Sequence, residues 1–152
     1  MDVAKYLKDK GVQFQELHHP VAFTAQQVAA EQHVPGRMMV KAVVVKVDNK
    51  YSLVVLPAIY NVDFQRLKKV LGAKNVSLAT EQEMSKLFPD CEVGAEPPFG
   101  ELYGVPTVVE EHLTSCSEIV FQAGSHTQTM KISYGDFVKL TDAKVGAFGQ
   151  HI

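Results

Sequence analysis

Lys41 is the residue whose type and position point most clearly to chemistry. It interrupts the most apolar run of the chain, Met38 to Val45, which is short and rich in valine and therefore predicts a β-strand. Side chains alternate between the faces of a strand, so Lys41 shares one face with Val43, Val45 and Val47. An ammonium group on an apolar face loses hydration and is retained where an anion or a polar group compensates. Lys41 is therefore a candidate ligand-binding residue.

A second interpretation of Lys41 stays open at the level of sequence. A lysine close to the end of a strand can lay its alkyl stem along apolar neighbours while its ammonium group reaches water. Lys46 falls on the opposite face of the same predicted strand, close to the turn that follows it. We expect Lys46 to be an ordinary solvated lysine.

Two irregular segments also carry residues suited to binding. The stretch from Val93 to Pro106 holds three glycines and three prolines, which allow close approach of a ligand and fix the shape of a loop. Backbone N–H groups ordered in this way can stabilise an oxyanion. The second segment, Gly124 to Thr127, gathers two hydroxyls and an imidazole between two predicted strands. Loops rich in glycine and proline are usually plain connections, and a plain hairpin turn explains the second segment about as well as a binding role.

The sequence lacks the motifs of several hydrolase classes. It contains no G-x-S-x-G nucleophile elbow, no H-E-x-x-H metal helix and no evident Cys-His pair. Cys91 and Cys116 are isolated, which predicts reduced thiols rather than a disulfide framework or a zinc site. The spacing of His18, His19 and His33 fits no known metal-ligand pattern. We therefore expect neither a metal nor a cofactor.

Bulk properties indicate an ordinary globular protein. The 152 residues fit one domain, and the net charge of −2 argues against a protein that grips long stretches of nucleic acid. Arg66, Lys68, Lys69 and Lys74 nevertheless make a local basic patch, for which a solvated helix face is the favoured explanation. No apolar stretch approaches the roughly 20 residues of a membrane span, and the first residues lack the apolar core of a signal peptide. A cytoplasmic location is expected.

Periodicity and capping signals predict both helices and strands. Thr24 and Thr80 each precede a Gln or Glu by three residues, which is the capping-box spacing, and Asp63 can cap a helix that ends before Gly72. Asp48-Asn49 predicts a hairpin turn. Helices are expected at residues 2–9, from 24 to about 34, 64–71, 81–88 and 134–140, and strands at 12–18, 38–47, 51–56, 76–78, 107–109, 118–121 and 128–132.

Taken in order, several segments resemble one known family. They are His19-Pro20-Val21-Ala22-Phe23-Thr24, Val40-Lys41-Ala42-Val43-Val44-Val45, Val93-Gly94, Pro98-Phe99-Gly100 and Gly124-Ser125-His126. Together they resemble the YbaK family, the free-standing relatives of the editing insertion domain of bacterial prolyl-tRNA synthetases. The resemblance covers nearly the whole chain. It implies an α+β fold, a single compact domain over residues 1–152 with a strongly curved mixed β-sheet and helices around it.

The resemblance also implies an activity, the deacylation of a tRNA that carries the wrong amino acid. Pocket binding separates small amino acids by only about 1–3 kcal/mol per methylene, so synthetases need a second, hydrolytic site. The implied substrates are non-cognate tRNAs, tRNA-Pro among them, that carry alanine, cysteine or serine. The implied partners are the acceptor end of an aminoacyl-tRNA and an aminoacyl-tRNA synthetase, with no membrane and no DNA.

The same resemblance assigns the site residues. Lys41, Gly100 and His126 are implied as catalytic, with Lys41 binding near the terminal adenosine and its ester. The implied substrate-binding residues are Thr24, Gly94, Pro98, Phe99, Gly124 and Ser125. Many family members have another residue at the position of His126. Catalysis would rest on positioning a labile ester, with Lys41 and loop N–H groups holding the phosphate or carbonyl while water or a substrate hydroxyl attacks.

A binding module without catalysis is the competing interpretation. Such a domain would hold a nucleotide or an aminoacyl end and dock onto an aminoacyl-tRNA synthetase. Lys41 and the glycine loop would look the same under both interpretations, so only turnover of the ester separates them.

Overall fold

A long antiparallel hairpin forms the centre of the fold. The computed structural model describes residues 2–18 and 35–152. Strands β2 (Met39–Val47) and β3 (Lys50–Pro57) pair in register from Val40↔Pro57 to Val47↔Lys50. Asp48 and Asn49 join them, and both have the positive φ values, 46° and 72°, that a tight two-residue hairpin turn requires. The predicted hairpin and its turn are confirmed.

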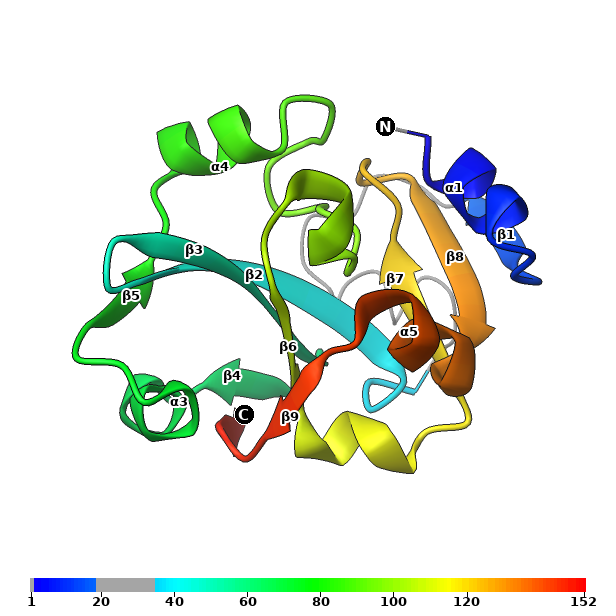
Figure 1. The fold of residues 1–152 in the computed structure, drawn as a ribbon. Helices are drawn as coiled ribbons and strands as arrows, with labels where there is room; N and C mark the ends of the chain where they lie inside the picture. Colours follow the sequence, from blue (N-terminus) through cyan, green and yellow to red (C-terminus); the bar gives the residue numbers. More distant parts are fainter. Residues whose placement is uncertain (1, 19–34) are drawn as a thin grey trace.

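The hairpin belongs to an eight-stranded mixed sheet. Along the sheet the order is β1-β8-β7-β2-β3-β6-β9, and β5 also pairs with β2 (Figure 1). The pairs β2–β7, β3–β6 and β6–β9 are parallel, and the others are antiparallel. A separate two-stranded sheet joins β4 (Tyr60–Val62) to β10 (Gly149–His151). The remaining strands are β1 (Gln15–His18), β5 (Val76–Leu78), β6 (Thr107–Glu110), β7 (Glu118–Gln122), β8 (Gln128–Ser133) and β9 (Lys144–Gly146).

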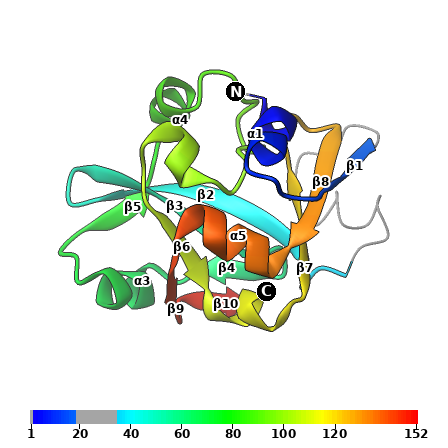
Figure 2. The ribbon, with the colours of Figure 1, turned by 45° about the vertical axis from the view of Figure 1, so that its right-hand side comes forward.

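Alternation along β2 divides the interior into two apolar clusters. Val40 and Val44 belong to the larger cluster, in which Phe99 is fully buried. Val45 belongs to the smaller cluster, together with Leu67. Helices α1 (Val3–Asp9) and α5 (Tyr134–Thr141) contribute to the larger cluster, and α3 (Phe64–Leu71) covers the smaller one. Figure 2 shows α5 and α3 lying at different parts of the sheet.

Capping side chains fix the helix ends where the sequence predicts them. Asp63 accepts hydrogen bonds from the N–H groups of Gln65 and Arg66, and Gly72 ends α3 in the left-handed conformation with φ 62°. Thr80 and Glu83 form both bonds of the capping box at the start of α4 (Glu81–Leu87). Short 3-10 helices η1 (Gly100–Tyr103) and η2 (Glu111–Ser115) complete the described elements.

The structure differs from the expected elements in a few places. The first strand begins at Gln15 rather than at residue 12, and three short strands, β4, β9 and β10, were not expected. Each of these three has only three residues, too few for an alternating pattern to stand out. The helix expected from Thr24 lies outside the described residues. Across residues 2–18 and 35–152, no helix has the length and apolarity to cross a membrane.

Glu83 provides a test of how the hairpin is held to α4. Its carboxylate accepts the Thr80 N–H, at 3.0 Å, and the Tyr51 hydroxyl, and these two bonds lower its pKa from 4.5 to about 2. Because folding lowers its pKa, the ionised Glu83 carboxylate stabilises the folded state above pH 4.5. This contribution to the free energy of unfolding disappears as the pH falls towards 2. Glu83→Gln should therefore melt below wild type at neutral pH, with a difference that shrinks progressively in acid. Thermal melts of both proteins across this range test it, and a difference that is constant with pH would contradict it.

Candidate functional site

Lys41 lies on the face of β2 that the sequence predicts. Val43, Val45 and Val47 of the same row pack into or against the smaller apolar cluster. The Lys41 side chain is half-buried and its Nζ donates to Oδ1 of Asn61, on β4, at 3.0 Å. Burial lowers the pKa of the Lys41 ammonium group. Its partner in the described chain is thus a neutral amide rather than a carboxylate, so the charge is left available to an anion.

The strand register connects Lys41 with the turn after β7. The parallel pairing of β2 with β7 consists of Met39↔Val120 and Val40↔Phe121, so Lys41 and Gln122 are the next residues on the two strands. Val40 and Phe121 both belong to the larger cluster, and alternation sends Lys41 and Gln122 to the opposite face. Beyond this pairing the strands run in different directions (Figures 1 and 2). Lys41 therefore stands where the two strands separate.

His126 joins the glycine loop to the turn after β7. Its ring Nε2 lies 2.9 Å from the Val93 carbonyl oxygen, and its Nδ1 lies 3.1 Å from the Gln122 side-chain oxygen. A carbonyl only accepts, so Nε2 carries a proton. The backbone N–H of His126 donates to Glu92 Oε2 at 3.0 Å. Because both ring nitrogens have protein partners, His126 fixes the loop and is not set up as a general base in this structure.

Backbone hydrogen bonds strengthen the same connection. The Gly124 N–H donates to the Ala95 carbonyl and the Glu92 N–H to the Gly124 carbonyl, each at 2.8 Å. Gly94 and Gly124 adopt φ values of 89° and 95°, which side-chain-bearing residues rarely adopt. Ser125 Oγ lies 3.3 Å from Thr127 Oγ1 within the turn. The structure thus brings the predicted residues Gly94, Gly124, Ser125 and His126 together.

Two buried oxygen atoms in this region lack partners in the described part of the chain. They are Oε2 of Glu96 and Oγ1 of Thr129, the residue that pairs with Gln122 across β7 and β8. Glu96 is 4% exposed, and its other oxygen accepts the Gly94 N–H at 3.2 Å. Burial raises the pKa of Glu96, although the Gly94 N–H and nearby His126 oppose the shift. Buried polar atoms are normally hydrogen-bonded, so these two mark a polar environment of functional interest.

The second half of the glycine loop is part of the core. Phe99 is fully buried and packs edge to face with Phe121, with 5.3 Å between the ring centroids. A Cβ on Gly100 would lie 2.5 Å from the Val105 carbonyl oxygen, so only glycine fits there. Pro98 is buried beside them. Packing alone accounts for these three residue types, of which the resemblance assigns Pro98 and Phe99 to substrate binding and Gly100 to catalysis.

The loop N–H groups differ from the expected oxyanion donors. The Gly94 N–H is bonded to Glu96, the Ala95 N–H to the Glu92 carbonyl at 3.0 Å, and the Gly100 N–H to Thr107 Oγ1 at 2.9 Å. These three donors are not open to a substrate in this structure. Thr24, the remaining predicted residue, lies outside the described residues.

Four residues of this site were not identified from the sequence. Gln122 and Glu92 hold His126, Glu96 holds Gly94, and Asn61 holds Lys41. Glu92 and Glu96 flank Gly94 in the sequence, so proximity to the glycine was an available signal. Gln122 and Asn61 act through strand pairings that no local pattern indicates.

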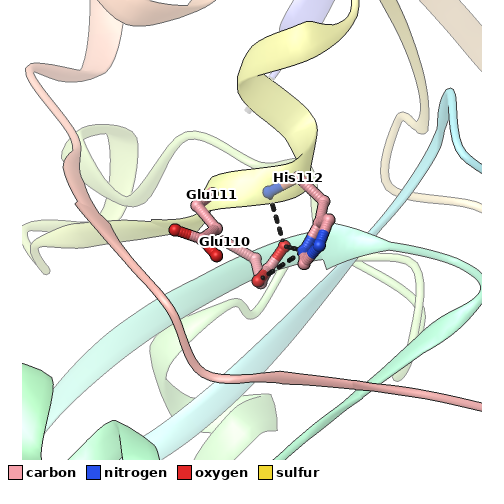
Figure 3. Close-up of side chains that lie close together, drawn as sticks. All are labelled: Glu110, Glu111 and His112. Atoms are coloured by element: carbon pink, nitrogen blue, oxygen red, sulfur yellow. Dashed lines mark hydrogen bonds and ion pairs between the residues drawn. The ribbon is translucent and has the colours of Figure 1, made fainter.

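One group of possible metal ligands among the described residues lies at the start of η2. Glu110, Glu111 and His112 offer ligand atoms within 4.8 Å of one another (Figure 3). Glu110 is buried, and its Oε2 accepts the His112 N–H at 2.7 Å and faces the ring Nδ1 at 2.8 Å. Tyr60 stacks on the His112 ring. Glu110 Oε1 also lies 2.9 Å from the ring Nδ1, so both carboxylate oxygens contact His112, and we interpret the group as the cap of η2.

Comparison with solved structures defines the fold class. A hypothetical protein solved by crystallography matches 97% of this chain and 99% of its own, with a TM-score of 0.88 and 23% identity. A candidate trans-editing enzyme for prolyl tRNA synthetase matches 97% of this chain and 94% of its own, with a TM-score of 0.87 and 20% identity. The expected α+β architecture with a mixed sheet is thus confirmed.

Sequence comparison identifies the family. Residues 19–140 match the model of the aminoacyl-tRNA editing domain, and the chain belongs to that family. It is 32% identical over 98 residues to a proline–tRNA ligase of Geobacillus sp. (strain WCH70), covering 64% of this chain and 17% of the ligase. A Bacillus cereus (strain AH187) proline–tRNA ligase is 27% identical over 115 residues, covering 74% and 20%. The chain therefore spans about a fifth of these ligases.

The buried carboxyl of Glu96 predicts an unusual pH dependence of stability. Because its pKa is raised, the folded state holds the proton more tightly, and wild type loses stability as the pH rises above the ordinary value of 4.5. Glu96→Gln avoids burying a charge and should melt above wild type at neutral pH, with the advantage fading towards pH 4.5. Thermal melts test this, with the exposed Glu111→Gln as the control for loss of one negative charge. A variant less stable than wild type at neutral pH would refute the prediction.

Proposed function

We propose that this protein hydrolyses the ester bond of mischarged aminoacyl-tRNA. The substrates we infer are small amino acids, alanine, cysteine or serine, on a non-cognate tRNA such as tRNA-Pro. The observation that carries the proposal is Lys41, a half-buried cation at the β2–β7 junction with only an amide opposite it in the described chain. Membership in the aminoacyl-tRNA editing domain family supports the substrate class. Hydrolysis of a panel of mischarged tRNAs is the direct test.

In the mechanism we infer, Lys41 supplies the electrostatic stabilisation. Its ammonium group holds the phosphate or the ester carbonyl of the terminal nucleotide. Because this cation is already partly desolvated, it stabilises the negative charge that develops in the transition state. Water adds to the carbonyl carbon, the bond to the ribose oxygen breaks, and that oxygen leaves with a proton. The site is shaped by Gly94, Gly124, Ser125 and His126, of which His126 acts as a positioning residue. The loop is anchored in the core by Pro98, Phe99 and Gly100.

Removing the Lys41 charge tests this mechanism. Lys41→Ala should lower the deacylation rate about 100-fold, the size typical of losing one electrostatic stabiliser. The fold should survive because Lys41 has no carboxylate partner in the described chain to leave unpaired. Lys131→Ala is the matched control, a strand lysine in a loose ion pair with Glu118 at 4.0 Å. Rates and melting temperatures of both variants decide the matter, and normal turnover in Lys41→Ala would remove the assignment.

The two cysteines test whether a protein nucleophile takes part. Burial raises the pKa of the Cys91 and Cys116 thiols, which keeps both in the weakly nucleophilic protonated form. A Cys91→Ser, Cys116→Ser double variant should retain its deacylation rate within about tenfold, or 1.4 kcal/mol, with a chelator present. A larger loss, with the melting temperature unchanged, would point to thiol or metal chemistry instead.

A binding module is the second candidate function. One observation favours it, namely that the N–H groups of Gly94, Ala95 and Gly100 are already bonded. A module of this kind would hold an aminoacyl end and dock onto a synthetase without turnover. Tight binding of a non-hydrolysable aminoacyl-adenosine analogue, combined with no hydrolysis of any mischarged tRNA, would select this function over the first.

A further inference from the structure

The cations of this chain are distributed unevenly. Residues 64–80 contain four of the 15 Lys and Arg residues and none of the 17 Asp and Glu residues. That segment therefore carries a charge of +4, and eleven cations against 17 acids leave −6 on the rest of the chain. A polyanion is repelled by a protein of negative net charge except where cations gather on one face.

Lys69 lies on the outer side of α3, Arg66 and Lys68 lie on its two flanks, and Lys74 lies in the turn after it. Phe64, Leu67 and Leu71 of α3 face the smaller apolar cluster. Arg66, Lys69 and Lys74 are exposed, and Lys68 is partly exposed. We call Arg66, Lys68, Lys69 and Lys74 the α3 patch. A hollow of about 670 Å³ adjoins the patch at Lys74.

Acidic neighbours of the α3 patch are turned towards the backbone. Asp48 accepts the N–H groups of Lys74 and Asn75 at 2.8–3.1 Å, and these bonds are the main cause of its lowered pKa. Asp63 caps α3 and also lies 3.6 Å from Arg66 Nε. Within residues 2–18 and 35–152, Lys68, Lys69 and Lys74 form no ion pair with a carboxylate. Lys68 and Lys74 lie close enough to Asp48 to help lower its pKa, but within the described residues no carboxylate is at ion-pair distance from the three ammonium groups, which stay available to an anion.

The small sheet of β4 and β10 connects the α3 patch to Lys41. Lys41 Nζ donates to Asn61 of β4, and α3 begins directly after that strand. Arg66 Nη1 donates to the Gly149 carbonyl of β10 at 3.3 Å. In Figure 1, α3 lies beside β4 and far from α1. An RNA whose end reaches Lys41 can thus extend its duplex over α3, which is about 12 Å long.

We propose that the α3 patch binds the phosphate backbone of the tRNA acceptor stem while the aminoacyl end occupies the site at Lys41. This inference rests on the proposed function, which supplies the tRNA. Phosphate contacts position a nucleic acid without reading its sequence, so the patch contributes affinity that is the same for every tRNA. Sequence and amino acid preference are left to the site at Lys41.

A double variant, Lys68→Gln with Lys69→Gln, tests the proposal. Its KM for full-length mischarged tRNA should rise roughly tenfold in low salt, and the slope of log KM against log salt should fall by about 2. Its kcat, and its hydrolysis of the same amino acid esterified to adenosine, should match wild type. Lys5→Gln with Lys8→Gln is the matched control, since both lysines are exposed on α1 and Lys8 is also in a last helical turn.

Equal KM values and salt slopes in the two double variants would overturn the proposal. Failure of the proposed function gives a different result, because wild type then hydrolyses neither the tRNA nor the adenosine ester. In that case, equilibrium binding of deacylated tRNA decides: weaker binding by the α3 variant alone supports the patch, and unchanged binding refutes it. Melting temperatures of both variants confirm that the loss of affinity is not a loss of fold.

Discussion

The early end of the parallel pairing between β2 and β7 is the constraint on which the candidate site depends. Each strand gives two residues to the pairing, and then β2 continues into its hairpin while β7 runs to the turn that holds His126. If the pairing continued, Lys41 and Gln122 would be two neighbouring residues in a closed sheet. Because it stops, Lys41 and Gln122 are the first residues of the segments in which the two strands separate. Burial of the ammonium group carries a desolvation cost, which the anion of the proposed substrate would offset.

Loop and turn then act as one unit through polar contacts rather than apolar packing. His126 and two backbone hydrogen bonds hold residues 92–96 against residues 122–126, and Phe99 fixes the other end of the loop in the core. This arrangement fixes the loop at both ends, by polar contacts at residues 92–96 and by core packing at Phe99. It also explains how a loop can be rich in glycine and still have a defined shape.

The sequence predicted the elements that carry strong local signals. The β2–β3 hairpin, the caps at Asp63 and Thr80, and the row of Lys41 with Val43 and Val45 follow from residue types and from the period of the pattern. The partners of Lys41 and His126 could not be predicted in this way. Asn61 reaches Lys41 from a three-residue strand, and Gln122 reaches His126 through register. Such contacts depend on tertiary pairing, which no window of a single sequence contains.

The β4–β10 ladder has a consequence for the order in which the site forms during synthesis. Asn61, the partner of Lys41, pairs with Gln150, which is added to the chain about ninety residues later. Chains emerge from the ribosome at about 5–20 residues per second, so β4 waits several seconds for its partner strand. Through that interval the hairpin can form, but the amide opposite Lys41 has no ladder to hold it. Lys41 is thus placed on its strand early in synthesis, whereas Asn61, its hydrogen-bond partner, is held by the β4–β10 ladder only at the end.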